Sequence, residues 1–126
     1  MKVPVRQETV LVVEDEPTLR MGLRATLRSE GFKVLVASTG PEGLEMALDQ
    51  SPDLLLLDVM LPGMNGFEIL RALRERRPDL PIILLTAKGE EQDKVQGLRL
   101  GADATGFVRW RAGGSWGVLR KLPDGR

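Results

Sequence analysis

Four side chains in this sequence of 126 residues carry oxygen atoms at the ends of short apolar runs. They are Glu14, Asp15, Asp58 and Thr86. Carboxylate oxygens are the ligands that a hard cation such as Mg²⁺ prefers, and a hydroxyl group beside a bound cation suits a phosphoryl group. A carboxylate can also act as a nucleophile that accepts a phosphoryl group as an acyl phosphate. If the four side chains meet, they predict a Mg²⁺-dependent phosphoryl-accepting site with Asp58 as the nucleophile.

Each of these residues also has a simpler structural interpretation. Asp58 fits the cap of a turn or of the following helix. Residues 14–16 fit the acidic start of a helix, because negative charges are favoured near a helix N-terminus. Thr86 fits a strand end or the N-cap of the next segment. The catalytic interpretation is favoured over these alternatives only if all the residues lie on one edge of the fold.

The elements that would position these residues alternate along the chain. Strands are predicted at residues 10–13, 32–37, 54–57 and 81–86. Helices are predicted from Pro17 to near Gly31, from the turn at 38–41 to about Gln50, from Phe67 through the basic residues 71–77, and from Glu90 to Leu100. The strand runs are apolar on both faces, which is typical of a parallel sheet covered on both sides.

Short alternating strands and helices predict an α/β fold of three layers, in which helices cover both faces of a parallel sheet. In such open sheets, ligands bind at the carboxyl ends of the strands. If the strands at 10–13, 54–57 and 81–86 are neighbours, the polar side chains meet at that edge. Three carboxylates brought together repel one another unless a cation lies among them.

Composition limits the other functions. The chain has no cysteine and no histidine, which excludes disulfides, thiolate sites, zinc-hydrolase sites and Ser-His-Asp triads within it. The formal net charge is zero, so nothing indicates a nucleic-acid or membrane surface. No apolar stretch is long enough for a signal peptide or a membrane span, and we expect a cytoplasmic protein.

The motifs around these strands resemble the receiver domain of two-component response regulators. The matching segments are VLVVEDEP at 10–17, PDLLLLDVMLPGMNG at 52–66, PIILLTA at 81–87 and GAD at 101–103. Four motifs in this order and spacing are specific, although each alone is weak. The resemblance covers residues 8–103, which we expect to form the receiver core. It implies a flavodoxin-like, doubly wound sheet with strand order 2-1-3-4-5, the order that is typical of this family.

The resemblance also implies a role for each residue. Asp58 would be the phospho-acceptor, Asp15 the direct Mg²⁺ ligand and Glu14 a second acid acting through water. The backbone carbonyl of Met60 would complete the protein's share of the metal ligands. Thr86 would donate a hydrogen bond to the phosphoryl oxygens, and the small side chain of Ala87 would leave room for them.

The partner implied is a sensor histidine kinase, whose phosphohistidine is the phosphoryl donor. A second copy of the chain is expected to associate weakly at most. The helix start at 90–94 resembles regulators that carry a DNA-binding domain, but none is seen in this sequence, so we expect no direct contact with nucleic acid or membrane. An aspartyl-phosphate hydrolase is not favoured, because such enzymes need a second aspartate two residues after the nucleophile, and that position is Met60.

The chain departs from the family after Asp103. Receivers normally continue with a strand that ends in Lys-Pro and then a fifth helix, whereas this chain reads ATGFVRW at 104–110. Without gaps the lysine position falls on Val108, and a one-residue insertion places Arg109 there. Residues 104–126 hold five of the 14 glycines, so a short fifth strand near 107–108 and no stable last helix are expected. This tail is typical of a truncated or frame-shifted end of a longer regulator.

The absence of the lysine is expected to affect phosphorylation and the conformational response to it differently. The carboxylates and the nucleophile lie within residues 8–103, so phosphorylation is expected to survive. The lysine normally pairs with the phosphoryl group and helps to draw the threonine inward, and arginine is not an equivalent replacement. The alternative function is therefore a degenerate receiver that acts as a binding scaffold and does not switch.

Overall fold

The computed structural model describes residues 7–59, 61, 63–85 and 104–106. In these residues five parallel strands form one sheet of order β2-β1-β3-β4-β5. The strands are β1 (Thr9–Val13), β2 (Lys33–Ala37), β3 (Leu54–Asp58), β4 (Ile82–Leu85) and β5 (Ala104–Gly106). The predicted strand order is confirmed, and the two strands that end in acidic residues, β1 and β3, are direct neighbours.

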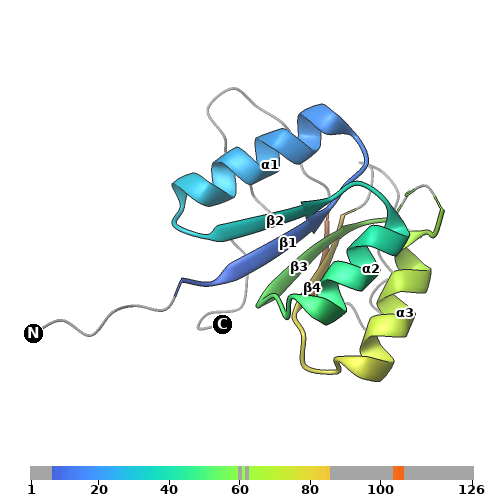
Figure 1. Cartoon of the computed structure of the whole chain (residues 1–126). Helices are drawn as coiled ribbons and strands as arrows, with labels where there is room; N and C mark the ends of the chain where they lie inside the picture. Colours follow the sequence, from blue (N-terminus) through green and yellow to red (C-terminus); the bar gives the residue numbers. More distant parts are fainter. Residues whose placement is uncertain (1–6, 60, 62, 86–103, 107–126) are drawn as a thin grey trace, which may run out of the picture.

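Three helices cover the sheet in the described residues. They are α1 (Pro17–Ser29), α2 (Gly40–Asp49) and α3 (Gly66–Arg76). Helix α1 lies on one face, and α2 and α3 lie side by side on the other (Figure 1). The three-layer arrangement is therefore confirmed. The helix predicted at 90–100 lies outside the described residues.

The core consists of two apolar layers, one on each face of the sheet. Alternate strand residues such as Val12, Leu56 and Ile83 pack toward α1, with Leu23 and Leu27 of that helix. The residues between them pack toward α2 and α3; they include Leu11, Leu55, Leu57, Leu84, Ile69, Leu70 and Leu73. Both faces of β1, β3 and β4 are buried, which explains why these strands are continuous apolar runs in the sequence.

The helices begin at residues that satisfy their free N–H groups. The Glu16 carboxylate accepts hydrogen bonds from the N–H groups of Thr18 (3.2 Å) and Leu19 (2.7 Å), just before the first helical residue, Pro17. Thr39 caps α2 through its hydroxyl group. Asn65 caps α3 with a capping box that includes the side chain of Glu68. These caps fix where each helix starts relative to the strand before it.

Two half-buried arginines hold the connection from α3 to β4. Arg74 Nη1 donates hydrogen bonds to three backbone carbonyls, of which the shortest is to Leu80 at 2.6 Å. Arg77 Nη1 donates to the carbonyl of Ala47 in α2 at 3.3 Å. The basic end of α3 therefore ties α2, α3 and the entry to β4 together, in addition to its favourable charge at a helix C-terminus.

The short fifth strand lies at Ala104–Gly106 and pairs with residues 83–85 of β4. It directly follows residue 103, where we ended the expected receiver core. The apolar pair at 107–108, where we expected the strand, lies outside the described residues, as does the remainder of the tail. Backbone pairing with β4 sets this strand, since Ala and Gly, two of its three residues, are depleted in strands. None of the described helices combines the length and the apolar character that a membrane span requires.

Candidate functional site

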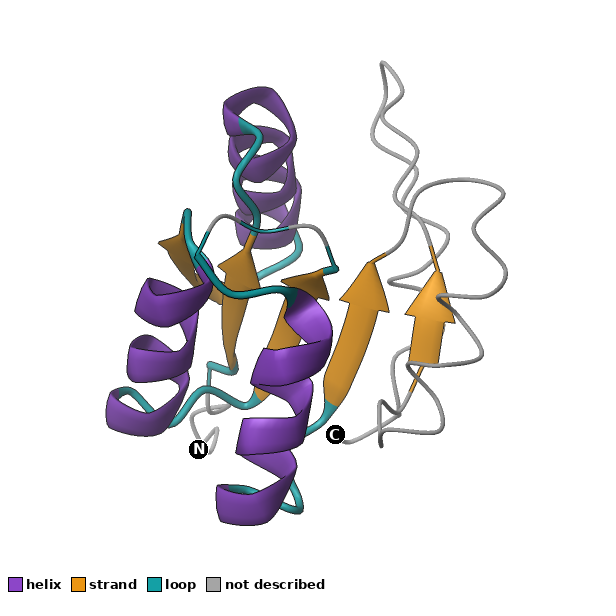
Figure 2. Ribbon diagram, turned by 90° about the vertical axis from the view of Figure 1, so that its right-hand side faces the viewer, coloured by secondary structure: helices purple, strands orange, loops and turns teal. Residues whose placement is uncertain are grey.

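The candidate site lies at the edge of the sheet where the strands end. The arrowheads of the strands lie along this edge (Figure 2). Val13 of β1 pairs with Leu57 of β3, so the next residue on each strand, Glu14 and Asp58, follows at the same level. Three carboxylate oxygens lie within 4.8 Å of one another, one each from Glu14, Asp15 and Asp58. The structure thus brings together the three carboxylates that the sequence analysis selected.

The other expected site residues lie outside the described residues. They are Met60, Thr86 and Ala87. Thr86 directly follows Leu85, which pairs with Asp58 in the register of β3 and β4. Their expected roles stay predictions.

Glu14 is the one buried charged side chain among the described residues, with 3% of its surface exposed. Burial raises the pKa of Glu14 from 4.5 to about 8, because a carboxylate loses its hydration inside the protein. The value of about 8 already includes the hydrogen bond from the N–H of Glu16, which lowers this pKa, and the negative charges of Asp58 and Asp15, which raise it. Without a cation, Glu14 is therefore mostly protonated at neutral pH.

The loop between β1 and α1 is fixed by its own acidic residues. The N–H of Glu14 donates to the carbonyl of Ala37 in β2 at 3.0 Å. The N–H of Glu16 donates to Glu14 Oε2 at 2.9 Å, and the Glu16 carboxylate caps α1. The alternative interpretation of residues 14–16 as an acidic helix start is thus correct for Glu16, while Glu14 and Asp15 contribute to the cluster.

The loop after Asp58 is held by two glycines whose lack of a side chain permits close contact. A Cβ atom on Gly66 would lie 2.3 Å from the carbonyl oxygen of Asp58, and one on Gly40 would lie 2.3 Å from that of Met64. The N–H of Gly66 also donates to the carbonyl of Val59 at 2.8 Å. The start of α3 is therefore packed against the backbone of the candidate nucleophile. The helix cap at this point is Asn65, so Asp58 does not cap α3.

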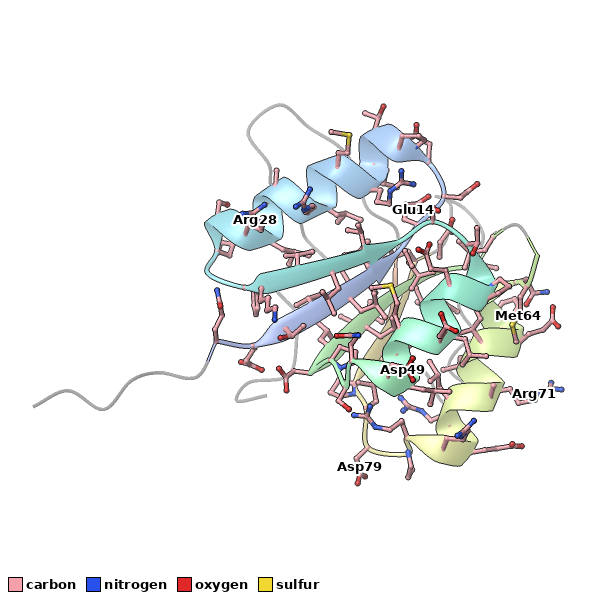
Figure 3. The ribbon with its side chains drawn as sticks, viewed as in Figure 1. Glu14, Arg28, Asp49, Met64, Arg71 and Asp79 are labelled. Atoms are coloured by element: carbon pink, nitrogen blue, oxygen red, sulfur yellow. The ribbon has the colours of Figure 1, made fainter. Side chains whose placement is uncertain are left out.

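Figure 3 shows Glu14 and Met64 at the same end of the sheet, near the starts of α1 and α3.

The positioning roles of Gly40 and Gly66 were missed in the sequence analysis. For Gly66 a signal existed, because it closes a Gly-rich turn that follows Asp58. For Gly40 no local signal distinguishes contact with Met64 from an ordinary helix entry.

The donor set determines what the cluster can hold. All three side chains offer only carboxylate oxygens, one of them buried and two partly or fully exposed. Such oxygen ligands, on an edge open to water, suit a hard divalent cation. A cation among them would offset the repulsion that raises the pKa of Glu14, so the residues present fit this kind of ligand.

Comparison with known proteins identifies the family. The model of the response regulator receiver domain matches residues 10–108 of this chain. The chain belongs to the response regulator receiver domain family. The resemblance inferred from the sequence motifs is therefore confirmed, and the receiver match extends through β5.

Curated relatives of this receiver are named as transcriptional regulators. AfsQ1 of Streptomyces coelicolor is 46% identical over 95 residues, which are 75% of this chain and 42% of AfsQ1. PhoP of Bacillus subtilis, the alkaline phosphatase synthesis regulator, is 48% identical over 94 residues, 75% of this chain and 39% of PhoP. CpxR of Escherichia coli is 50% identical over 94 residues, 75% of this chain and 40% of CpxR. The receiver thus spans about two fifths of the length of these relatives.

Solved structures agree with the fold. CheY4 of Vibrio cholerae matches with a TM-score of 0.76 and 30% identity, over 85% of this chain and 90% of that chain. A chain in the CheX-CheY-BeF3-Mg²⁺ complex from Borrelia burgdorferi matches with a TM-score of 0.77 and 26% identity, over 82% of this chain and 80% of that one. The flavodoxin-like fold of the receiver is thereby established.

Replacing Glu14 with Gln tests the buried carboxylate. Because its folded-state pKa is raised from 4.5 to about 8, the stability contributed by neutral Glu14 is complete below pH 4.5 and is lost as the pH rises through about 8. Gln has the same shape, can still accept from Glu16 and does not ionise. With EDTA present, we expect Glu14→Gln to be more stable than wild type by about 1–3 kcal/mol at pH 8, and nearly equal at pH 4.5.

Urea denaturation at the two pH values measures this difference. The exposed Glu45 of α2 offers the matched control, and Glu45→Gln should change stability little at either pH. If wild type is more stable than Glu14→Gln at pH 8, the raised pKa assigned to Glu14 is contradicted.

Replacing Gly66 with Ala tests the packing of α3 against Asp58. The new methyl group would press on the Asp58 carbonyl, so the backbone that carries this carboxylate must move. We expect a loss of about 1–3 kcal/mol in stability and a smaller rise of Tm on adding Mg²⁺. Gly31→Ala is the control. Its φ of +100° strains any residue other than glycine, but a Cβ atom there would contact nothing, and Gly31 is not part of the site. Both variants should be less stable, and an equal Mg²⁺ response in both would refute the positioning role of Gly66.

Proposed function

We propose that this receiver takes up a phosphoryl group on Asp58 in a Mg²⁺-dependent reaction, with the phosphohistidine of a sensor histidine kinase as donor. The observation that carries the proposal is the cluster of three carboxylates, with ligand oxygens within 4.8 Å of one another, at the end of β1 and β3. Membership of the receiver family supports it, because all three carboxylates lie within the matched residues 10–108.

The metal ligands are inferred from the cluster together with the resemblance to the receiver family. Asp15, exposed, and Asp58, half-buried, would bind the cation directly. Glu14 would act through water, and the backbone carbonyl of Met60 would complete the set. Bound Mg²⁺ would neutralise the carboxylate charges and those of the incoming phosphoryl oxygens. The related CheY structure from Borrelia burgdorferi is named as a complex with Mg²⁺, which supports the choice of ion.

The transfer itself needs one nucleophilic oxygen. A carboxylate oxygen of Asp58 attacks the phosphorus, the phosphorus–nitrogen bond to the donor imidazole breaks, and a phosphorus–oxygen bond forms. The histidine nitrogen leaves with its electron pair, and the product is an aspartyl phosphate. Thr86 would donate a hydrogen bond to a phosphoryl oxygen, and Ala87 would leave space beside it. Glu14 must ionise for the cluster to attract the cation, despite its raised pKa.

The wider role is inferred from the relatives. They are named transcriptional regulatory proteins, and this receiver matches only about two fifths of their length. We infer that phosphorylation of this receiver serves a phosphorelay that controls transcription, and that it works beside the kinase in the cytoplasm. In this role the chain is a signalling domain, and its own chemistry is limited to gaining and losing the phosphoryl group.

Incubation with Mg²⁺ and a small phosphodonor such as acetyl phosphate tests the acceptor. We expect the wild-type chain to gain the mass of one phosphoryl group, because the carboxylate and its neighbours suffice for the reaction. The Asp58→Asn variant should gain none. Asp49→Asn is the matched control, since Asp49 lies at the exposed end of α2, away from the cluster (Figure 3), and its adduct should equal that of wild type. Absence of an adduct on wild type would end the proposal.

A second candidate is a phospho-accepting scaffold that does not switch. The sequence at 104–110 favours it, because it lacks the Lys-Pro with which the fifth strand ends in the family. Hydrogen exchange with and without the phosphodonor distinguishes the two. The scaffold predicts an adduct on Asp58 with unchanged exchange in peptides around Thr86 and Phe107, whereas slower exchange there identifies a switching receiver.

A further inference from the structure

Arg20 contacts the backbone of the metal-ligand loop from the helix that follows it. This half-buried residue lies in the first turns of α1. Its Nη1 atom donates one hydrogen bond to the carbonyl of Glu14 at 3.0 Å and another to the carbonyl of Asp15 at 3.2 Å. One guanidinium nitrogen thus bridges the two residues whose carboxylates belong to the candidate site.

The contact supplies a restraint that the loop otherwise lacks. The backbone of Glu14 is held by the bond from its N–H to Ala37, and Glu16 is held as the cap of α1. Within the part of the chain that the structure describes, Asp15 has no hydrogen bond to its backbone other than the one from Arg20. This guanidinium group therefore restrains the backbone of Asp15, whose exposed side chain also forms a hydrogen bond with the Glu14 carboxyl group. A fixed fork of donors suits two neighbouring carbonyls.

We propose that Arg20 is a positioning residue for the metal site, one that aims the carboxylates of Glu14 and Asp15 by holding their carbonyls. The proposal rests on the proposed function, because it concerns affinity for Mg²⁺. Side chains that orient metal ligands without touching the metal commonly change its affinity by about 10- to 100-fold. Arg20 acts on the backbone carbonyls of the two ligand residues, Glu14 and Asp15.

Charge alone predicts the opposite effect. The guanidinium group carries a positive charge close to a cation site, so its removal would strengthen cation binding if only Coulomb repulsion mattered. Its removal weakens binding if positioning matters more. A residue that only packs α1 onto the sheet would change the stability of the protein and leave the affinity unaltered. The sign of the change in affinity therefore separates the three roles.

Calorimetric titration of the whole chain with Mg²⁺ alone gives this sign. We expect Arg20→Met, which keeps the apolar stem but no donor and no charge, to weaken Mg²⁺ binding about tenfold. Arg20→Lys restores a charged donor that can bridge the carbonyls and should recover most of the affinity. Arg24→Met is the matched control, since the exposed Arg24 lies one turn further along α1 and its replacement removes the same charge. Its affinity should stay within about twofold of wild type.

A second measurement separates this role from loss of folding. The amide signal of Glu16, whose N–H donates to Glu14 Oε2, should shift in Arg20→Met without metal, while the signals of β4 stay in place. If Arg20→Met does not fold, Arg20→Gln is titrated instead, because the shorter amide cannot reach both carbonyls. Unchanged or tighter Mg²⁺ binding in Arg20→Met, or in Arg20→Gln where that variant replaces it, overturns the proposal with the proposed function intact. No Mg²⁺ binding by wild type overturns both.

Discussion

The candidate site of this receiver is organised around a buried carboxylate that lies beside two others. Glu14 is almost fully buried, and its pKa rises to about 8 because burial and the charges of Asp58 and Asp15 both oppose ionisation. No stability argument favours such a cluster, since an apolar residue at this position would not carry the desolvation cost. The cluster is understandable as a cation site, in which the charge that destabilises the free protein creates the affinity.

The surrounding elements restrain that cluster from two sides. The loop after β1 is held by polar contacts, through the Glu16 cap and the Arg20 guanidinium group. The loop after β3 is held by close packing. Because Gly66 and Gly40 have no Cβ atom, their backbones lie close to the carbonyl oxygens of Asp58 and Met64. The Arg20 and glycine contacts both act on the backbone of these loops.

Family membership and site geometry support the function from independent directions. The family match covers residues 10–108 and includes β5, while the carboxylate cluster is a property of this chain's own structure. The relatives extend well beyond the matched region, which is about two fifths of their length. The departure from the family lies at 104–110, next to the strand that pairs with β4. Under the proposed function, acceptance of a phosphoryl group and the response to it would therefore be separable in this chain.

The sequence by itself determined the strands β1 to β4, the three described helices and the meeting of Glu14, Asp15 and Asp58. Apolar periodicity and strand-end polarity are local signals, and the family motifs supply the strand order. Tertiary structure alone decided the rest. The position of β5 depends on pairing with β4, the pKa of Glu14 on its burial, and the contact of Gly40 with Met64 on packing between distant segments. The bridge from Arg20 to two carbonyls has no sequence signature, because backbone atoms are the same at every residue.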